Sequence, residues 1–402
     1  MSAEPPRPNR HTLIRRHNES LVLNVIGSSD QPVGNATIVD QTGLSRPTVN
    51  VLIDDLCNTG LIQEAGIRTG FLGRPASLVE LNPEFAAVVA IAVDSTSITV
   101  AISDLTAHIR CEVRQTLRKS ASIVDAIDKL LDACLDQSGF NSNRIRAYCV
   151  SEPGVSSSTG VPRALAPNVP ELHDAWLQKR LNSRNAAPIL FENDVNLAAI
   201  GEQRFGIAKG EPSFAFLMVD TGIGMGLIVN GDVWRGVHGA AGEAGYLPIG
   251  EGRLTGRAAK IGSLELHAGS RAFLSRFREA TGKSRATVST VLNLAVQGDG
   301  KAQEVIHHEA DLVSRAVLST VALLDPAFVV LGGEIGSHQL VADAVRSRMK
   351  SIAPYPVDVR ISTLGERAPV LGALATALDV ARQELVLPTI SKDLRTSNGI
   401  HP

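Results

Sequence analysis

Residues 39–62 carry the pattern that most restricts how this chain folds, because they predict two short helices joined by a tight turn. The first helix is expected to end at Thr42-Gly43-Leu44. Ser45 then serves as the N-cap of the second helix, and Pro47 falls in its first turn, where a missing N–H costs nothing. Apolar residues at helical spacing form the buried face: Val49, Leu52, Ile53 and Leu56. Polar side chains beside the cap can meet base edges in a DNA major groove: Arg46, Thr48 and Asn50, next to Ser45.

The segment that follows, residues 61–81, predicts a β-hairpin beside the second helix. Its glycine-rich middle carries Arg68 and Arg74, and a flexible cationic tip suits contact with phosphate or the minor groove. The whole pattern predicts a winged helix-turn-helix that binds double-stranded DNA. Two simpler alternatives stay open: a helical hairpin packed on a larger core, and a plain turn at Gly73-Arg74-Pro75. Upstream, basic residues predict an arm that contacts phosphate: Arg7, Arg10, His11, Arg15, Arg16 and His17.

Length and composition set the class of protein. A chain of 402 residues is too long for one core and predicts two or three domains. With 44% hydrophobic residues and a net charge of −2, it has the composition of a globular protein, not of a disordered or nucleic-acid-coating chain. No apolar run reaches membrane-spanning length and no signal-peptide pattern opens the chain, so we expect a cytoplasmic protein with no membrane partner. The cysteines at 57, 111, 134 and 149 lack metal or redox spacing and predict reduced thiols.

From Ala86 onward, helix-like stretches alternate with short apolar strands, which is typical of α/β folds. Polar clusters follow several strand ends, where such folds bind their ligands. They supply amide and carboxylate groups that suit a hydroxyl-rich ligand such as a sugar: Asn168, Asn193, Asp194, Glu243 and Glu265. Any one of these could instead be a surface residue or a helix cap. Glycine-rich turns at 220–226 and 329–335 either cradle phosphate through backbone N–H groups or are plain turns.

The order of these motifs resembles the ROK family (repressor, open reading frame, kinase) over nearly the whole chain. The dispersed motifs that carry the resemblance are Pro153-Gly154, Ala166-Pro167-Asn168, Asn193-Asp194, the turn at 221–226, Gly239 to Gly245, Gly262-x-Leu264-Glu265 and Leu331-Gly332-Gly333. The resemblance implies an α/β chain in which a winged helix-turn-helix precedes a two-lobed body of the actin-like ATPase, ribonuclease H-like fold. It also implies a sugar site between the lobes, formed by the five polar residues above and by Tyr246, which stands where the family has a histidine. In the family's kinases, the residue that matches Asp194 is the general base.

The resemblance also implies a domain layout. Residues 1–82 are expected to form the DNA-binding domain with its basic arm, residues 83–194 and 366–388 the first lobe, and residues 195–365 the second lobe with the dimerisation surface. Residues 389–402 are polar and predict a loose tail.

Two departures from the family's kinases decide the expected activity. The kinases have a D-x-G-G-T-K hairpin, whereas this chain has Asp94-Ser95-Thr96-Ser97, a shorter turn without the glycine pair. Its backbone cannot approach a triphosphate closely, and phosphoryl transfer depends on such positioning. We therefore expect no enzyme activity, no cofactor, and Asp194 as a ligand contact. The family's zinc-binding cysteines and histidine are also missing, since Tyr246 and Ser263 stand in two of those places, so we expect no metal.

The resulting expectation is a transcriptional repressor of carbohydrate-metabolism genes. It would be a homodimer or a dimer of dimers that binds an inverted repeat in operator DNA, and a sugar effector between the lobes would change its DNA affinity. Two alternatives remain: a sugar kinase that also binds DNA, and a constitutive DNA-binding protein whose body only dimerises.

Overall fold

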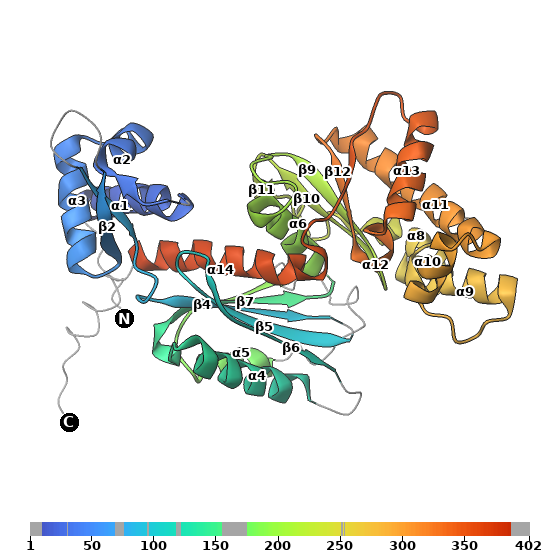
Figure 1. The fold of residues 1–402 in the computed structure, drawn as a ribbon, viewed down its shortest axis with the longest axis horizontal. Helices are drawn as coiled ribbons and strands as arrows, with labels where there is room; N and C mark the ends of the chain where they lie inside the picture. Colours follow the sequence, from blue (N-terminus) through green and yellow to red (C-terminus); the bar gives the residue numbers. More distant parts are fainter. Residues whose placement is uncertain are drawn as a thin grey trace, which may run out of the picture.

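The computed structural model describes residues 10–29, 31–68, 76–94, 96–117, 122–154, 175–250, 252 and 254–386. Figure 1 shows a small N-terminal domain followed by two lobes, each built on one five-stranded sheet. Arg74, Ser95 and Asn168, which the sequence singled out, lie outside the described residues, as does the tail expected at 389–402. Among the helices of the described ranges, none is both long and apolar enough to cross a membrane.

The N-terminal domain is a cluster of three helices backed by a small sheet. Its elements are α1 (Arg10–Ser28), β1 (Val33–Gly34), α2 (Asn35–Thr42), α3 (Arg46–Asn58), β2 (Ile62–Arg68) and β3 (Ala76–Leu81). α2 ends at Gly43, whose φ of 69° is left-handed, and α3 begins after Ser45, whose hydroxyl accepts the Thr48 N–H at 3.3 Å. β2 and β3 form an antiparallel hairpin, and β1 pairs with β3. This is the arrangement of a winged helix-turn-helix.

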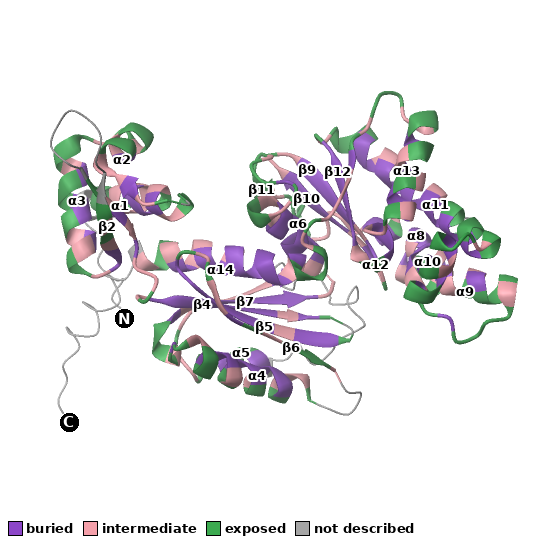
Figure 2. Ribbon diagram, in the orientation of Figure 1, coloured by how far each residue is buried: buried purple, intermediate pink, exposed green. Residues whose placement is uncertain are grey.

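The first lobe is a sheet in the order β6-β5-β4-β7-β8. β4 (Ala87–Val93), β5 (Ser97–Asp104) and β6 (Ile109–Thr116) are antiparallel neighbours, whereas β7 (Ile145–Glu152) and β8 (Ile189–Asn193) run parallel to β4. β4 is buried on both faces, which explains its nearly continuous apolar run (Figure 2). α4 (Ile123–Ser138), the short 3-10 turn η1 (Ser142–Arg144) and α5 (Ala175–Asn182) follow in sequence, and α4 and α5 pack into the core on one face.

The second lobe repeats this topology in the order β11-β10-β9-β12-β13. Its strands are β9 (Phe214–Val219), β10 (Ile223–Val229), β11 (Asp232–Val233), β12 (Val329–Gly332) and β13 (Val359–Ile361). Long helices cover its outer face: α9 (Gly269–Thr281), α10 (Val288–Val296), α11 (Gly300–Leu324) and α13 (Gln339–Ile352). Short helical segments complete it: η5 (Ala244–Tyr246), α7 (Arg257–Ile261), α8 (Ser263–His267), α12 (Gly333–Gly336) and η6 (Gly365–Arg367). Two such sheets in succession are the actin-like ATPase, ribonuclease H-like fold that the resemblance predicted.

Two helices lie between the sheets: α6 (Asp194–Phe205), which contacts β9 and β10, and α14 (Ala368–Val386), which contacts β4 and β7 (Figure 1). They cross with their backbones in contact. A Cβ at Gly372 would stand 1.8 Å from the Leu197 carbonyl oxygen, and one at Gly201 would stand 2.4 Å from the Ala368 carbonyl oxygen. Only glycine allows so close an approach at these two positions.

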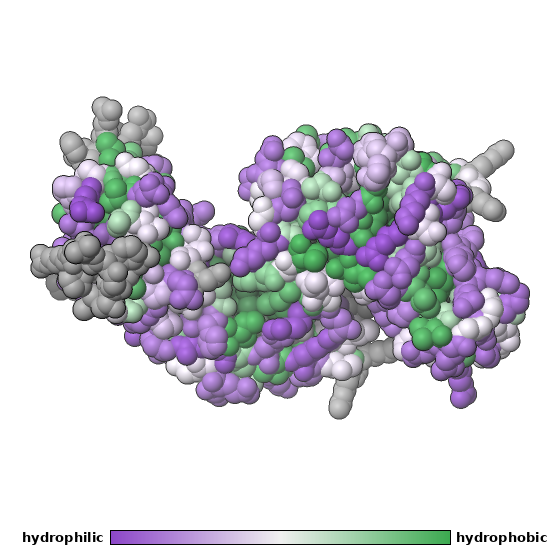
Figure 3. Space-filling view, turned by 45° about the horizontal axis from the view of Figure 1, so that its top comes forward, coloured by the Kyte–Doolittle hydropathy of each residue, from purple (hydrophilic) through white to green (hydrophobic). Residues whose placement is uncertain are grey.

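The far end of α14 packs against α1 of the N-terminal domain. Leu23 of α1 and Leu378 of α14 belong to one continuous apolar cluster, which also includes the buried side chains of α3. The Arg382 guanidinium lies 3.0 Å from where a Cβ of Gly27 would stand, and its Nη2 donates to the Leu105 carbonyl at 3.0 Å. The N-terminal domain therefore rests on the same helix that crosses α6. On the face drawn in Figure 3, hydrophobic residues gather in the middle, where the lobes meet, and hydrophilic residues dominate the outer surfaces.

Candidate functional site

The start of α3 holds the residues predicted to read DNA. The hydroxyls of Ser45 and Thr48 hydrogen-bond to each other at 2.7 Å, so both side chains help to close the helix cap. Asn50 Oδ1 accepts from the amide of Asn35 in α2 at 2.8 Å, which fixes the position of α2 against α3. Arg46 and Asn50 are exposed at the helix start. The four predicted residues thus lie together, but the side chains of two of them form the cap.

The described part of the basic arm expected upstream of this helix is helical, and its contact with phosphate stays a prediction. Residues from Arg10 onward form α1 rather than an extended arm. Arg15 donates to Glu19 at 3.0 Å and to Asp55 of α3 at 2.7 Å, and Arg16 is only 8% exposed. Arg16 is thus buried inside the domain, whereas Arg15 is 57% exposed and engaged with two carboxylates. The tip of the hairpin, with the Arg68 side chain and Arg74, lies outside the described residues.

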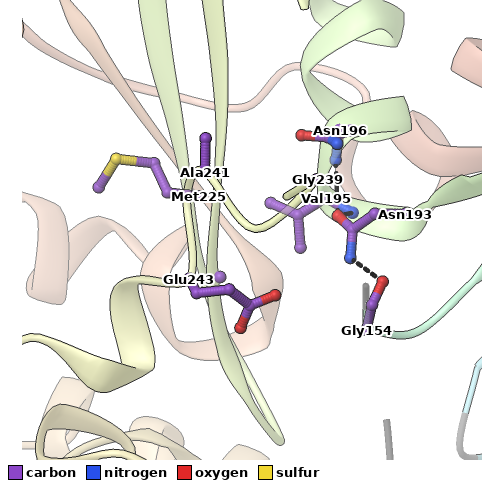
Figure 4. A pocket seen from close by; sticks show the side chains of 10 residues that line it. Gly154, Asn193, Val195, Asn196, Met225, Gly239, Ala241 and Glu243 are labelled. Carbon is purple, nitrogen blue, oxygen red and sulfur yellow. Dashed lines mark hydrogen bonds between the residues drawn. The ribbon is translucent and has the colours of Figure 1, made fainter. Parts of the chain in front are cut away.

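A pocket opens where α6 begins (Figure 4). Its walls come from both lobes. In the first lobe, Gly154 follows β7 and Asn193 is the last residue of β8. In the second lobe, Gly224 lies in β10, and the loop before η5 contributes Gly239, Gly242 and Glu243. In Figure 4 the Glu243 carboxylate points toward the wall formed by Asn193 and Gly154. The small residues leave room for a ligand close to the backbone.

Asn193 is the N-cap of α6. Its Oδ1 accepts the N–H groups of Val195 at 2.9 Å and Asn196 at 3.0 Å, and its Nδ2 donates to the Gly154 carbonyl at 2.9 Å. The side chain therefore joins the ends of β7 and β8 and shapes the pocket. The sequence left open that a predicted ligand residue could instead be a helix cap. Asn193 is such a cap, and it also lines the pocket.

Asp194 is the first residue of α6 and is half-buried. Burial raises the pKa of its carboxyl to about 7, and the charges of Glu243 and Asp220 act in the same direction. The Val195 N–H, which donates to Oδ1 at 2.9 Å, opposes this shift. A carboxyl group with a pKa near neutrality can accept a proton from a ligand hydroxyl or share one with it.

Glu243 and Glu265 supply the second lobe's carboxylates. Burial raises the pKa of Glu243, and the charge of Glu265 raises it further, so the two groups lie close enough to interact. Glu265 stands in α8, and its Oε2 accepts the Ile223 N–H at 3.3 Å, although burial keeps its pKa above the usual range. Glu243 thus lies near both Asp194 and Glu265, while Asn168 lies outside the described residues. Of the predicted ligand residues, Asn193 and Glu243 line the pocket, and their contact with a ligand stays a prediction.

Tyr246 is 38% exposed, and its hydroxyl donates to the Lys260 carbonyl at 2.9 Å. The charges of Glu243 and Glu265 contribute to the raised pKa of this hydroxyl, which places it beside the carboxylates. Ser263, which stands where the family has a zinc ligand, donates to the Ile249 carbonyl at 2.9 Å. Direct hydrogen bonds therefore fasten the segment around η5 and α8. In the part of the chain that the structure describes, no three His, Cys, Asp or Glu side chains cluster closely enough to hold a metal ion.

The turn between β4 and β5 is closed by its own first residue. Asp94 Oδ1 accepts the N–H groups of Thr96 at 2.6 Å and Ser97 at 2.8 Å, and its Oδ2 accepts the Ser97 hydroxyl at 2.6 Å. These hydrogen bonds hold the pKa of Asp94 low although burial opposes them. Arg114 donates to the Ser97 hydroxyl at 3.0 Å and pairs with Glu366 of η6. The backbone N–H groups of Thr96 and Ser97 are therefore already occupied.

Acidic side chains gather at the two later glycine turns. Asp220 follows β9, and its carboxylate accepts the N–H of Thr221 at 2.7 Å and that of Glu334 at 3.3 Å. Burial raises the pKa of Glu334, and the charges of Asp220 and Glu366 add to the shift. Gly333 has a φ of 81°, and a Cβ there would stand 2.5 Å from the Val219 carbonyl oxygen. Close packing between strand ends thus explains this glycine without a ligand.

Two residues next to the pocket were missed by sequence reasoning. Glu192 is buried, its Oε1 accepts the Asn196 amide at 2.9 Å, and its Oε2 accepts Arg235 Nε at 2.7 Å. Glu192 precedes the Asn193-Asp194 motif, which was the available signal, whereas nothing local in the sequence identifies Arg235 as its partner.

Comparison with known proteins identifies the family. Residues 88–380 match the ROK family. The xylose repressor of Bacillus subtilis (strain 168) is 24% identical over 375 residues, which cover 92% of this chain and 96% of that protein. Among solved structures, a ROK family transcriptional regulator described as a homologue of the E. coli MLC protein superimposes with a TM-score of 0.75 at 17% identity, covering 94% of this chain and 99% of its own. A ROK family glucokinase from Streptomyces griseus, solved with glucose and AMPPNP, has a TM-score of 0.62 at 23% identity over 74% of this chain and 100% of its own. The chain therefore belongs to the ROK family.

Proposed function

We propose that this protein is a transcriptional repressor whose affinity for operator DNA is governed by a sugar bound between its lobes. One observation carries the proposal: α14 crosses α6 directly behind the pocket and then packs against α1 of the winged helix-turn-helix. The relatives support it, because the match to the B. subtilis xylose repressor extends over 92% of this chain and so includes both the N-terminal domain and the body.

The chemistry of the pocket favours an uncharged polyhydroxylated ligand. Asp194, Glu243 and Glu265 all have raised pKa values. The pKa of Asp194, about 7, lets its carboxyl group both donate and accept hydrogen bonds near neutral pH, and sugar hydroxyls require both. A phosphorylated sugar would bring negative charge beside three acidic groups, so a free sugar fits better.

The coupling to DNA follows from the packing between the sheets. A ligand that contacts residues of both lobes changes the angle between them only if it binds the two arrangements unequally. α6 begins at Asp194. Its backbone touches the backbone of α14 at Gly201 of α6 and at Gly372 of α14, where no side chain separates the two helices. A shift of α6 therefore moves α14, and with it the support of α1. A coupling free energy of about 1–3 kcal/mol is sufficient for a useful switch.

We further propose a homodimer that places two α3 helices in successive major grooves of an inverted repeat, about 34 Å apart. Arg46 and Asn50 are the exposed candidates for base contacts, while Ser45 and Thr48 orient the helix start. Arg68 and Arg74 of the hairpin are the candidates for phosphate contacts. The expected location is the cytoplasm, where the operator is accessible.

The body acts as a sensor rather than a kinase in this proposal. Asp94 occupies the N–H groups that would face a phosphate, and Asp220 and Glu334 put negative charge at the two later glycine turns. Both features disfavour the binding of a polyphosphate, because it would find these N–H groups already occupied and would be repelled by the carboxylates. The second candidate is a sugar kinase that also binds DNA, and one observation favours it: the Asp194 pKa of about 7 suits a general base.

Thermal melting with D-xylose, D-glucose and N-acetylmannosamine tests the sensor. A sugar at 100 times its dissociation constant is expected to add about 2.7 kcal/mol to the stability, and Glu243→Gln is expected to abolish the shift. The same sugar should change the operator affinity in a gel-shift titration. If no sugar alters either measurement, the body is a dimerisation scaffold and the proposal fails.

ATP consumption separates the second candidate. We expect no turnover above background with any sugar of the panel. Robust turnover that Asp194→Asn abolishes would establish the kinase and overturn the sensor as the sole role of the body.

A further inference from the structure

An ion pair joins the two lobes beside the pocket, and we infer that its arginine, Arg235, positions the loop that presents Glu243 to the ligand. Glu192 belongs to β8 of the first sheet, whereas Arg235 follows β11 of the second sheet. The inference rests on the proposed function, since it names a positioning residue for sugar binding at the same site.

Glu192 is committed through both of its carboxylate oxygens. Oε1 accepts the Asn193 N–H at 3.0 Å and the Asn196 side-chain amide at 2.9 Å. Oε2 accepts both Nε of Arg235 at 2.7 Å and Nη2 of Arg235 at 2.6 Å. The side chain of Glu192 is 9% exposed, so the arginine neutralises a carboxylate that water barely reaches.

The loop from Arg235 to Glu243 is fastened to a different lobe at each end. Near its start, the Arg235 guanidinium holds Glu192 of the first lobe, and its carbonyl accepts the Ala241 N–H at 3.0 Å, which closes the loop on itself. Near its end, the Gly242 carbonyl accepts the Met225 N–H at 2.8 Å, which ties the loop to β10. A Cβ at Gly242 would stand 1.9 Å from the Met225 carbonyl oxygen, so this end is held by backbone contact.

Glu243 directly follows this doubly anchored loop, and Gly239, Ala241 and Gly242 of the loop line the pocket. The ion pair therefore sets the distance between the Glu243 carboxylate and the wall formed by Asn193 and Gly154 before a ligand arrives. The Arg235 side chain is 51% exposed, so water can solvate the guanidinium when the lobes move apart. Pre-organisation of this kind strengthens ligand binding because the loop need not be ordered at the moment of binding.

The experiment compares Arg235→Ala and Arg235→Lys with Arg315→Ala. Arg315 is a matched control, because it is 53% exposed, pairs with Asp311 at 2.7 Å, and lies on α11 away from the pocket. Calorimetric titration with D-xylose, D-glucose and N-acetylmannosamine measures sugar affinity. Hydrogen–deuterium exchange of residues 236–246 in the sugar-free protein measures the order of the loop, and a gel shift without sugar measures DNA affinity.

We expect Arg235→Ala to weaken sugar binding by about 10- to 100-fold and to speed exchange in residues 236–246. Arg235→Lys should restore part of the sugar affinity, since it keeps the charge but loses the two-pronged contact. Arg315→Ala should match the wild type in all three measurements.

Unchanged exchange in the loop of Arg235→Ala overturns the inference, whatever the sugar data show. If the wild type binds no sugar of the panel but the loop exchanges faster in Arg235→Ala, the positioning role stands and the proposed sugar site fails. If Arg235→Ala does not fold, Arg235→Lys decides, because wild-type affinity and exchange in that variant contradict the need for the two-pronged contact.

Discussion

Replacement of Gly372 by alanine tests whether the crossing of α6 and α14 holds the body together. The new Cβ would stand 1.8 Å from the Leu197 carbonyl oxygen, about 1.6 Å short of an ordinary contact at 3.4 Å. The obstructing atom belongs to a helix backbone and cannot swing away as a flexible side chain does. Relief therefore requires the two helices to separate, and the sheets packed on them must follow.

The cost can be estimated from the size of this conflict. Extra volume in a packed core destabilises by about 1–3 kcal/mol, and we expect about 3 kcal/mol here because the new Cβ meets backbone. At Gly201 a new Cβ would stand 2.4 Å from the obstructing Ala368 carbonyl oxygen, so the conflict is smaller and the loss of stability should be smaller too. Gly300, the first residue of α11, has no atom within 4 Å of such a Cβ. Alanine there should be neutral or stabilise by up to about 1 kcal/mol.

Urea unfolding of the three alanine variants checks this order. The unfolding free energy should fall most for Gly372→Ala, less for Gly201→Ala, and not at all for Gly300→Ala. If Gly372→Ala unfolds at the same urea concentration as Gly300→Ala, the helices can part without loss, and the proposed transmission from pocket to DNA through their contact is refuted.

Four further predictions concern single residues. The pKa of Asp194 is about 7 in the folded protein and about 4 in the unfolded chain. The folded state therefore binds the proton more tightly, and the melting temperature should fall as the pH rises between these values. Asp194→Asn should flatten that slope. Arg46→Ala should weaken operator binding by about 1–3 kcal/mol while affinity for scrambled DNA changes less, as measured by gel shift; equal losses would mean a phosphate contact. Arg382→Ala should keep sugar-free DNA binding but reduce the sugar-induced change in the same assay, and an undiminished response would exclude transmission through α14. Ser45→Ala should cost about 1 kcal/mol of stability in the DNA-binding domain, measured by urea unfolding, because the N-cap of α3 is lost.

Features that depend on near neighbours in the chain could be predicted from the sequence. Ser45 caps α3 through the Thr48 N–H, and the four apolar residues of that helix are buried as their spacing indicated. The strand at 87–93 follows from its apolar run, and Asp194 directly follows the end of β8, as the strand and helix patterns around it indicated. Periodicity and capping are local properties, so a single sequence carries them.

Features that depend on partners far along the chain could not be predicted in this way. Arg15 and Arg16 look like part of a basic arm in the sequence, but Arg15 reaches Asp55, forty residues away, and Arg16 is buried. The pairing of Glu192 with Arg235 spans 43 residues and depends on how the two sheets are placed. Such contacts depend on how the domain and the lobes pack, and the spacing of residues along the chain does not predict them.

The apolar cluster shared by α1, α3 and α14 has a consequence for how proteins of this architecture exchange parts during evolution. If the N-terminal domain were separated from the two lobes, its Leu23 and Ile26 would be exposed to water, and so would Leu378 of α14. We therefore expect an exchange of N-terminal domains between relatives to succeed only when the end of α14 is exchanged with them, although more than 280 positions separate the two segments in the sequence.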